Sequence, residues 1–263
     1  MRMPSTRHVV PAIGRVTFLE IIRDKLLFSV LFLAFLLLGL SLLAAKITFL
    51  RPGRLVLDLG LMGVSLTSLL IGVFVGSSLI AREFERRTIS LILSHPISRV
   101  QFLLGKFLGM VFAISANWIL LVGAYFLILF FYTTESADFN RTLLFSVVLA
   151  WVQALVITSV VFLFSSFTTT TLSAIFSLCV FLIGQSVVQI QVMASQLPQS
   201  WLKWVLGAVA RVWPNFDWFN LGFKVTYGLP VSWTYFLGTC CYGFCLVGFF
   251  LLIAGVVIQG KEV

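Results

Sequence analysis

The sequence predicts an all-α integral membrane protein with six transmembrane helices, an N-terminal interfacial elbow helix, a short cytoplasmic helix between spans two and three, and a short outer interfacial or re-entrant helix before span six. Composition is the first observation: 60% of the 263 residues are hydrophobic and 10% are charged, whereas a soluble domain carries about 25% charged residues. The second is that long apolar runs are continuous rather than alternating, which favours helices over a β-barrel. The third is that all seven prolines lie outside these runs, as expected of helix boundaries.

The charge-free runs place the spans, because a helix needs about 20 apolar residues to cross a bilayer. The longest run extends from Thr142 to Leu202 and is predicted to hold two helices. Its break is placed at Thr168–Thr171, since helices tolerate a run of β-branched polar residues poorly. The predicted spans of this single transmembrane domain, residues 1–263, are approximately 26–45, 59–81, 107–134, 142–166, 172–194 and 231–258.

The basic residues predict the orientation and argue against nucleic-acid binding. The net charge is +9, but the basic residues flank the spans, where such residues face the cytoplasm and anionic lipid. Eleven of the 18 Lys and Arg residues fall on the side that holds both termini and segment 82–106, and seven fall on the other side. We therefore expect a multi-pass protein of the cytoplasmic (inner) membrane with both termini in the cytoplasm.

Residues 9–25 predict the elbow helix. At about 100° per residue, one side of this helix is apolar and carries Phe18, Leu19, Ile21, Ile22 and Leu26. The other side is charged and carries Glu20, Arg23 and Asp24. We expect an amphipathic helix that lies in the cytoplasmic interface and continues directly into the first span. An irregular basic leader is the alternative.

Segment 195–230 predicts the outer helix. It is rich in aromatic residues, which anchor proteins at the membrane–water boundary. Trp201, Val205 and Val209 would share one face of a helix. A short interfacial or re-entrant helix and a simple aromatic belt are both compatible with this pattern.

Segment 82–106 predicts two short cytoplasmic helices that meet at a proline bend. A dense charged turn formed by Glu83, Glu85, Arg86 and Arg87 follows the second span. Thr88–Leu93 is then apolar but too short to cross the membrane, and Ser94-His95-Pro96 is a turn signal. A second short helix over Ile97–Lys106 would lead into the third span. Such a mixed-charge surface suits docking by a cytoplasmic partner.

The same segment resembles the signature of ABC transporter permeases of the type-2 exporter superfamily. Three elements carry the resemblance: Glu-x-Glu-x-x-Thr after the second span, then Leu-Ser-x-Pro-Ile-Ser-Arg, then Gly-Lys at the third span. They are matched by Glu83, Glu85 and Thr88, by Leu93, Ser94 and Pro96 to Arg99, and by Gly105 and Lys106. Arg87 stands where many members have glycine. Thr17, Glu20 and Arg23-Asp24-Lys25 also resemble the N-terminal segment of the superfamily.

The resemblance implies a permease subunit that pairs with a second copy or with a similar permease. Two cytoplasmic ATPase subunits, which hold the ATP and Mg, would dock on a coupling helix in 82–106 and on the elbow, and ATP-driven closure would move substrate outward. The implied coupling residues are Glu83, Glu85, Arg86, Arg87, Thr88, Pro96, Arg99 and Lys106. The implied elbow residues are Phe18, Glu20, Ile22, Arg23 and Asp24.

No catalytic or metal site is expected in this chain. The sequence has no Gly-rich phosphate loop, since Gly105-Lys106 lacks the upstream glycine, so nucleotide chemistry is expected on another chain. Cys240, Cys241 and Cys245 have no histidine or carboxylate beside them and are expected to pack in the protein interior. No charge is predicted inside a span, which argues against an ion-coupled carrier.

The strongest polar side chains inside the predicted spans are amides. Gln185 and Gln189 would share a helix face, and Asn117 and Gln153 lie in other spans. Gln185, Gln189 and Asn117 are candidates for a substrate path, and hydrogen bonding between helices is the simpler interpretation. The apolar spans weakly favour a hydrophobic or amphipathic substrate. The alternative function is a non-transporting membrane scaffold that docks a cytoplasmic partner.

Overall fold

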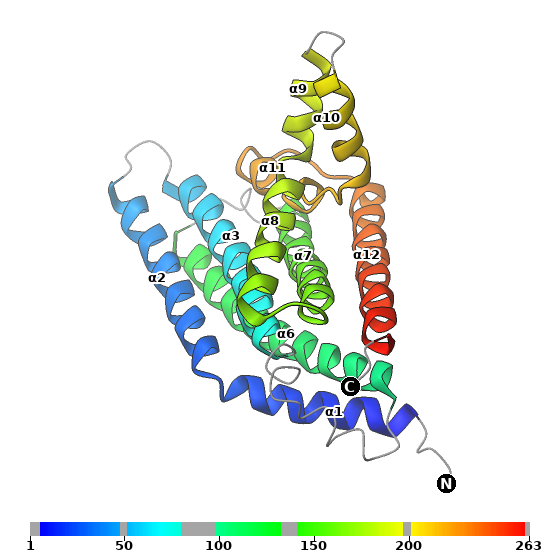
Figure 1. Ribbon diagram of the computed structural model, residues 1–263. Helices are drawn as coiled ribbons and strands as arrows, with labels where there is room; N and C mark the ends of the chain where they lie inside the picture. The colour runs from blue at the N-terminus through cyan, green and yellow to red at the C-terminus, as the bar shows by residue number, and fades with distance from the viewer. Residues whose placement is uncertain (1–5, 48–51, 80–97, 133–140, 197–200, 261–263) are drawn as a thin grey trace.

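The computed structural model describes residues 6–47, 52–79, 98–132, 141–196 and 201–260, and these residues form helices and turns without any strand (Figure 1). Five described helices are long and apolar enough to cross a membrane, and a bent pair brings the number to as many as six. The predicted all-α, multi-span fold class is therefore confirmed. The long helices are α2 (Lys25–Ile47), α3 (Pro52–Leu70), α6 (Arg99–Tyr132), α7 (Arg141–Ser165) and α12 (Trp233–Gln259), and the bent pair is α8 (Thr170–Gln185) with α9 (Val187–Gln196).

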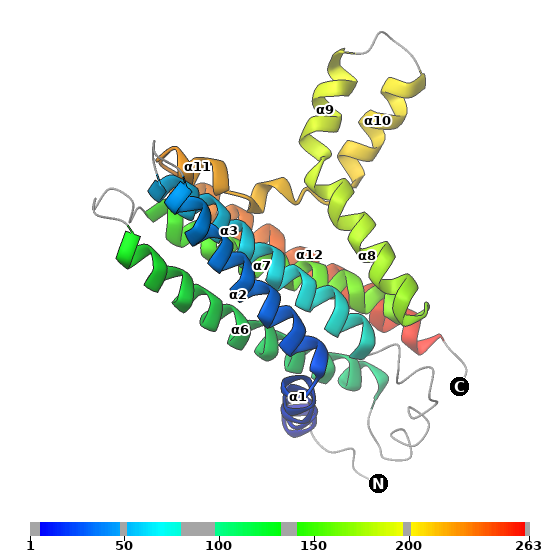
Figure 2. The same ribbon diagram turned by 90° about the vertical axis from the view of Figure 1, so that its left-hand side faces the viewer.

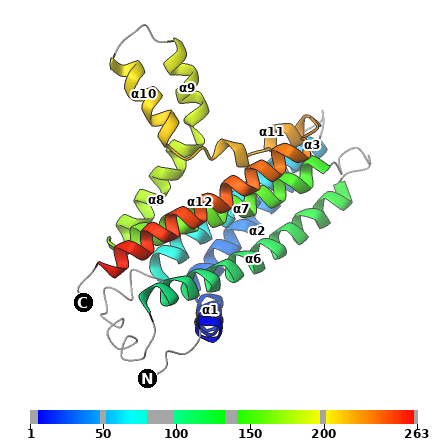
Figure 3. The ribbon, with the colours of Figure 1, turned by 90° about the vertical axis from the view of Figure 1, so that its right-hand side faces the viewer.

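The remaining elements are shorter. Helix α1 (Thr6–Ile22) lies across one end of the long helices, beside the beginning of α6 (Figure 1). Helix α11 (Gly222–Thr226) lies at the other end. Helices α9 and α10 (Trp201–Val212) form a hairpin that projects away from the bundle (Figures 2 and 3). We call the two ends of the bundle the α1 end and the α11 end.

Helices α3 and α7 form the centre of the bundle. In the most apolar window of each span, 78% of the residues are buried in α7 and 67% in the span Gly53–Leu79, which continues α3 through the π-helix η1 (Ile71–Val75), against 22% for α2 and 28% for α6 and for α12. The outer helices expose large apolar side chains instead, among them Phe32 and Phe130. Such surfaces are stable in contact with lipid or with another apolar surface.

Several predicted boundaries agree closely with the structure. Helix α7 covers Arg141–Ser165, where a span over about 142–166 was expected, and α12 covers Trp233–Gln259, where about 231–258 was expected. The break at Thr168–Thr171 is confirmed, since α8 begins at Thr170. The two helices that it separates are joined by the Ser165 and Ser173 hydroxyl groups, 2.7 Å apart.

The helices extend beyond the predicted spans and include charged residues near their beginnings. Helix α3 begins at Pro52 and contains Asp58, and α6 begins at Arg99 and contains Lys106. A helix continues beyond its apolar run wherever a charged side chain can reach water or a partner, and here Asp58 is exposed and Lys106 forms an ion pair. For the same reason the residues before Lys106 form the first turns of α6 rather than a separate short helix.

The fifth predicted span, about 172–194, is not one straight helix. It bends by 53° between α8 and α9. Near the bend, the backbone N–H of Phe216 donates to the Gly184 carbonyl at 3.0 Å. The Phe216 ring is fully buried, and a Cβ atom on Gly184 would overlap it. A distant segment therefore packs where the helix turns, and no local sequence signal marks that contact.

Candidate functional site

The α1–α6 joint is a close contact between the elbow helix and the beginning of the third span. We define it by Ile13, Gly14 and Thr17 of α1 and by Gly105 and Gly109 of α6. A Cβ atom on Gly105 would lie 2.7 Å from the Ile13 Cβ, and one on Gly109 would lie 2.5 Å from the Thr17 Cβ. Real side chains do not approach so closely, so the two backbones can meet only where α6 has glycine.

An ion pair lies beside this joint. The Lys106 Nζ is 3.2 Å from Oε2 of Glu20, and the lysine side chain is 7% exposed while the glutamate side chain is 57% exposed. The ammonium also lies 5.8 Å from the centre of the Phe102 ring. A buried ammonium group requires such partners, because removing it from water is costly. The structure thus joins a predicted coupling residue, Lys106, to a predicted elbow residue, Glu20.

The elbow does not continue directly into the first span, and this prediction is wrong. Helix α1 ends at Ile22 and α2 begins at Lys25. Between them, Oδ1 of Asp24 accepts a hydrogen bond of 3.0 Å from the Leu26 backbone N–H. Asp24 therefore caps the beginning of α2, where a helix has unsatisfied N–H groups, and Arg23 lies in the turn.

The apolar residues of α1 divide between two surfaces. Phe18 packs edge-to-face against Phe112 of α6, with ring centres 6.5 Å apart. Val16, Leu19 and Ile22 are exposed. An exposed apolar face on a helix that lies across the end of a bundle is typical of contact with the membrane interface, which agrees with the predicted position of the elbow.

The beginning of α6 is fixed by two interactions. The Ser98 hydroxyl accepts from the Gln101 N–H at 3.2 Å, and the Gln101 side-chain oxygen accepts from the Ser98 N–H at 3.1 Å, which is the reciprocal pattern of a capping box. Nη1 of Arg99 donates to the Ile258 carbonyl at 3.0 Å. A cation at the carbonyl end of α12 is electrostatically favourable, so Arg99 links α6 to α12.

Most of the predicted coupling residues lie outside the described residues. The structure does not describe residues 80–97, which include Glu83, Glu85, Arg86, Arg87, Thr88 and Pro96. Of the predicted coupling set, it places Arg99 and Lys106, both near the beginning of α6. Segment 82–106 therefore leads into a helix that is attached to α1 and to α12.

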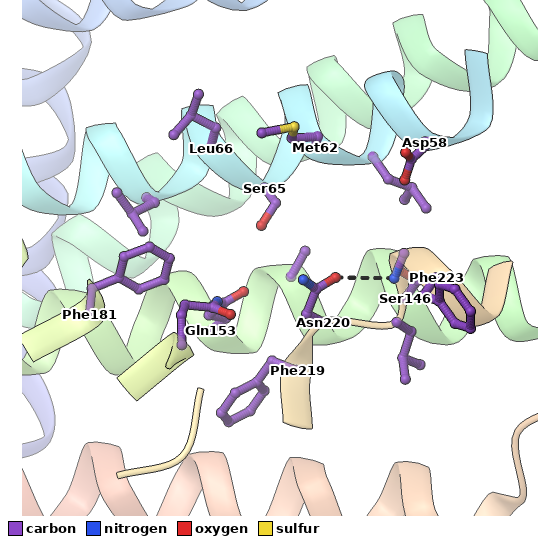
Figure 4. Close-up of a pocket in the computed structure, with 16 residues that line it drawn as sticks. Asp58, Met62, Ser65, Leu66, Ser146, Gln153, Phe181, Phe219, Asn220 and Phe223 are labelled. Atoms are coloured by element: carbon purple, nitrogen blue, oxygen red, sulfur yellow. Dashed lines mark hydrogen bonds between the residues drawn. The ribbon is translucent and has the colours of Figure 1, made fainter. Parts of the chain in front are cut away.

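A cavity of about 360 Å³ lies between α3, α7, α8 and segment 219–223, in the half of the bundle nearer α11 (Figure 4). Its apolar lining includes Leu61, Met62, Leu66, Leu69, Phe181 and Phe219. Its polar lining consists of Asp58, Ser65, Ser146, Gln153, Gln185 and Asn220. A largely apolar cavity with a few converging polar groups is the usual form of a small-molecule site.

The polar groups of the cavity are incompletely hydrogen-bonded. The Asn220 Oδ1 accepts from the Gly222 N–H at 3.1 Å (Figure 4). The Thr226 hydroxyl lies 2.9 Å from the Gly222 carbonyl oxygen and 3.5 Å from Oδ1 of Asp58. Gln153 is 4% exposed, and its Nε2 has no hydrogen-bond partner among the described residues.

The structure separates the three residues proposed for a substrate path. Gln185 lines the cavity, whereas Gln189 and Asn117 are not part of its lining. Gln185 ends α8 and Gln189 lies in α9, so the bend removes the helix face that they were expected to share. Asn117 is buried in α6, and its side-chain amide has no hydrogen-bond partner within the described part of the chain.

Sequence reasoning missed Asp58 and Asn220 as site residues. Asp58 ends an apolar run, and it was therefore interpreted as the boundary of a span. Asn220 lies in an aromatic-rich segment with no local motif. For Asp58, the available signal was a carboxylate at the end of a predicted span with no basic residue directly beside it. For Asn220 there was no local signal, because this residue approaches α3 only when the chain is folded.

A comparison with protein-family models matches residues 17–203 to the ABC-2 family transporter protein model. This range begins in the elbow, includes segment 82–106 and both residues of the Lys106–Glu20 pair, and ends in α10. A search of curated proteins finds no match. Because the match covers more than half of the chain, the chain belongs to the ABC-2 family and is a permease subunit of an ABC-2 type transporter.

Proposed function

We propose that this permease moves its substrate outward across the cytoplasmic (inner) membrane, powered by ATP hydrolysis on two separate cytoplasmic ATPase subunits. The ATPase subunits dock on segment 82–106 and on α1, and both termini face the cytoplasm. ATP and Mg bind the partner subunits, because this sequence has no phosphate-binding loop. Two copies of the chain, or one copy and a similar permease, form the membrane part of the complex.

The observation that carries this proposal is the attachment of the docking segment at the α1 end. Segment 82–106 leads into α6, whose first turns contact α1 through the α1–α6 joint and the Lys106–Glu20 pair. Arg99 links the same turns to α12. A force applied to the docking segment would therefore move α1, α6 and α12 together, which is what coupling of ATPase closure to the spans requires.

The cavity supports an outward path. In the proposed orientation, segment 82–106 is cytoplasmic. This segment leads into α6 at the α1 end of the bundle, so the α1 end faces the cytoplasm in the same orientation. The cavity then lies in the outer half of the membrane, with Gln185 in its lining. Gln189 and Asn117 stay proposed as path residues elsewhere along the route.

The test reverses the charge of the proposed docking surface. In the double variant Glu83→Lys/Glu85→Lys, we expect the ATPase subunits to be lost from the purified complex while the permease stays in the membrane. The double change is needed because one exposed ion pair contributes only about 0–1 kcal/mol. The matched control is Glu135→Lys/Asp138→Lys, which makes the same charge change in the predicted outer loop between spans three and four.

Quantitative pull-down of the ATPase subunits with each variant measures the result. Retention of the ATPase subunits by the Glu83→Lys/Glu85→Lys variant contradicts the docking surface. An equal loss in the control contradicts it too, because the effect would then depend on charge and not on position.

A further inference from the structure

The cavity bounded by α3, α7, α8 and segment 219–223 has negative charge, and no positive charge, among the described residues of its lining. We infer that it binds an organic cation with an apolar body, an inference that rests on the proposed function because the cavity lies on the proposed outward path. Among the described residues that line it, Asp58 is the only charged one. A carboxylate without a neighbouring cation in the lining attracts a cationic ligand and repels an anionic one.

Asp58 lies where an entering ligand would meet it. The residue is exposed at the α11 end of the cavity, and its Oδ1 is 3.5 Å from the Thr226 hydroxyl. A carboxylate has two oxygens and about four acceptor sites, so this contact leaves it acceptor capacity for a ligand. Leu69, at the other end of the α3 lining, is about 16 Å further along the helix at 1.5 Å per residue, which leaves length for an apolar body behind the charge.

The walls suit an apolar, aromatic or cationic body. Met62 and Leu66 of α3 and Phe181 of α8 line the cavity with apolar side chains (Figure 4). Phe219 also belongs to the lining, but its ring points toward α12, where a Cβ atom on Gly243 would lie 3.0 Å from it. The two phenylalanine rings are held by the buried Phe216, whose ring centre is 5.9 Å from that of Phe181 and 6.3 Å from that of Phe219. Phenylalanine faces attract cations as well as apolar groups. The volume of about 360 Å³ lies within the range of about 300–1,000 Å³ that is usual for small-molecule sites.

The buried side-chain amide of Gln153 is a second, independent observation that indicates a ligand. Its side chain is 96% buried, being 4% exposed, and it lines the cavity from α7. Its Nε2 has no hydrogen-bond partner in the described chain. A buried donor without a partner is unfavourable unless a ligand or a water molecule accepts its hydrogen bond. The cavity therefore offers a donor at its inner wall and a carboxylate at its outer end.

The experiment compares two probes of the same shape and opposite charge. Tetraphenylphosphonium and tetraphenylborate are equilibrated with the full chain in phosphatidylcholine nanodiscs, and binding to empty nanodiscs is subtracted. We expect saturable binding of the phosphonium probe only. The Asp58→Asn variant should bind it about three- to tenfold more weakly, as expected for loss of one partly screened ion pair. Asp58→Lys should abolish phosphonium binding and permit borate binding.

The matched control is Asp217→Asn, at the same end of the bundle but outside the cavity lining. Burial raises the pKa of Asp217, an effect that Lys224 partly offsets. Asp217→Asn makes the same chemical change as Asp58→Asn. The control should bind the phosphonium probe as the unmodified chain does.

Equal binding of the two probes by the unmodified chain, as a water-filled crevice would give, overturns the inference. So does unchanged phosphonium binding in Asp58→Asn, or an equal loss in Asp217→Asn. Circular dichroism and the newly acquired borate binding of Asp58→Lys exclude misfolding as the cause of a loss. The proposed function fails separately, in the ATPase pull-down, because probe binding is measured on the permease without its partners.

Discussion

At the scale of single residues, charged side chains near the α1 end attach one helix to another. Lys106 reaches Glu20 of α1, and Arg99 reaches the Ile258 carbonyl of α12. Both basic residues were expected to contact an ATPase subunit. The structure gives each of them an intramolecular partner that holds the first turns of α6 in place, and their contact with an ATPase subunit stays a prediction.

The Lys106–Glu20 pair predicts a charge-swap result. Glu20→Lys should lower the unfolding temperature of the purified permease, because two ammonium groups would then face each other at the α1–α6 joint. The destabilisation should be about 1 kcal/mol, since Glu20 is 57% exposed and water screens the pair. The double variant Glu20→Lys/Lys106→Glu should recover part of the loss. Thermal unfolding in detergent measures this, and a double variant no better than Glu20→Lys contradicts the pairing.

Residue roles were predictable from the sequence only where a pattern is local. The motif that includes Gly105 and Lys106 indicated an important position. It did not indicate that Gly105 allows α1 to pack closely against α6, or that Lys106 forms an ion pair with Glu20. Those contacts join residues about 90 positions apart. Asp58 was misinterpreted for a related reason: a charge that ends an apolar run can be a boundary or part of a site, and only packing distinguishes the two.

At the scale of elements, the α1–α6 joint is the contact on which the elbow depends. Gly109 lies where a Cβ would be 2.5 Å from the Thr17 Cβ, whereas Gly123, further along the same helix, has no atom within 4 Å of its Cβ position. Substituting each of the two glycines by alanine therefore separates the cost of disturbing a close helix contact from the gain in helix propensity.

Gly109→Ala should destabilise the permease by about 1–3 kcal/mol, because overpacking forces α1 away from α6. Gly123→Ala should be neutral or stabilising by up to about 1 kcal/mol, since alanine favours a helix over glycine. Unfolding temperatures of the two variants measure the difference. An unchanged unfolding temperature in Gly109→Ala would contradict the close contact.

The helices themselves were largely predictable, and their ends and bends were not. A charge-free run of about 20 residues can only be satisfied as a spanning helix in lipid, and described helices cover most of each predicted span. The break before Thr170 followed from β-branched residues. The 53° bend between α8 and α9 did not. Gly184 lies beside the bend, but the residue that packs against it is Phe216, which is distant in sequence.

At the scale of the whole molecule, the two ends of the bundle differ in structure. The α1 end gathers α1, the beginning of α6 and the end of α12, and segment 82–106 leads into it. The other half holds the cavity, and the α9–α10 hairpin projects from the bundle (Figure 2). Exposed apolar faces on α2, α6 and α12 leave area for lipid and for a second permease.

The proposed orientation predicts the result of reporter fusions. A fluorescent protein that matures only in the cytoplasm should fluoresce when fused after residue 263. Alkaline phosphatase, which is active only outside the cytoplasm, should be active when inserted between α9 and α10. The excess of basic residues on the side of the termini is the physical reason. The reverse pattern of activities would show that the chain is inserted in the opposite sense.

The central claim is that ATPase subunits act on this permease through segment 82–106. The most direct measurement is the ATPase activity of the purified complex in nanodiscs, with the unmodified permease and with Glu83→Lys/Glu85→Lys. We predict that ATPase subunits co-purify with the unmodified permease, that the permease changes their rate of hydrolysis, and that the double variant loses both effects. Failure of any ATPase subunit to co-purify, with a hydrolysis rate indifferent to the permease, would contradict the account and favour a non-transporting scaffold.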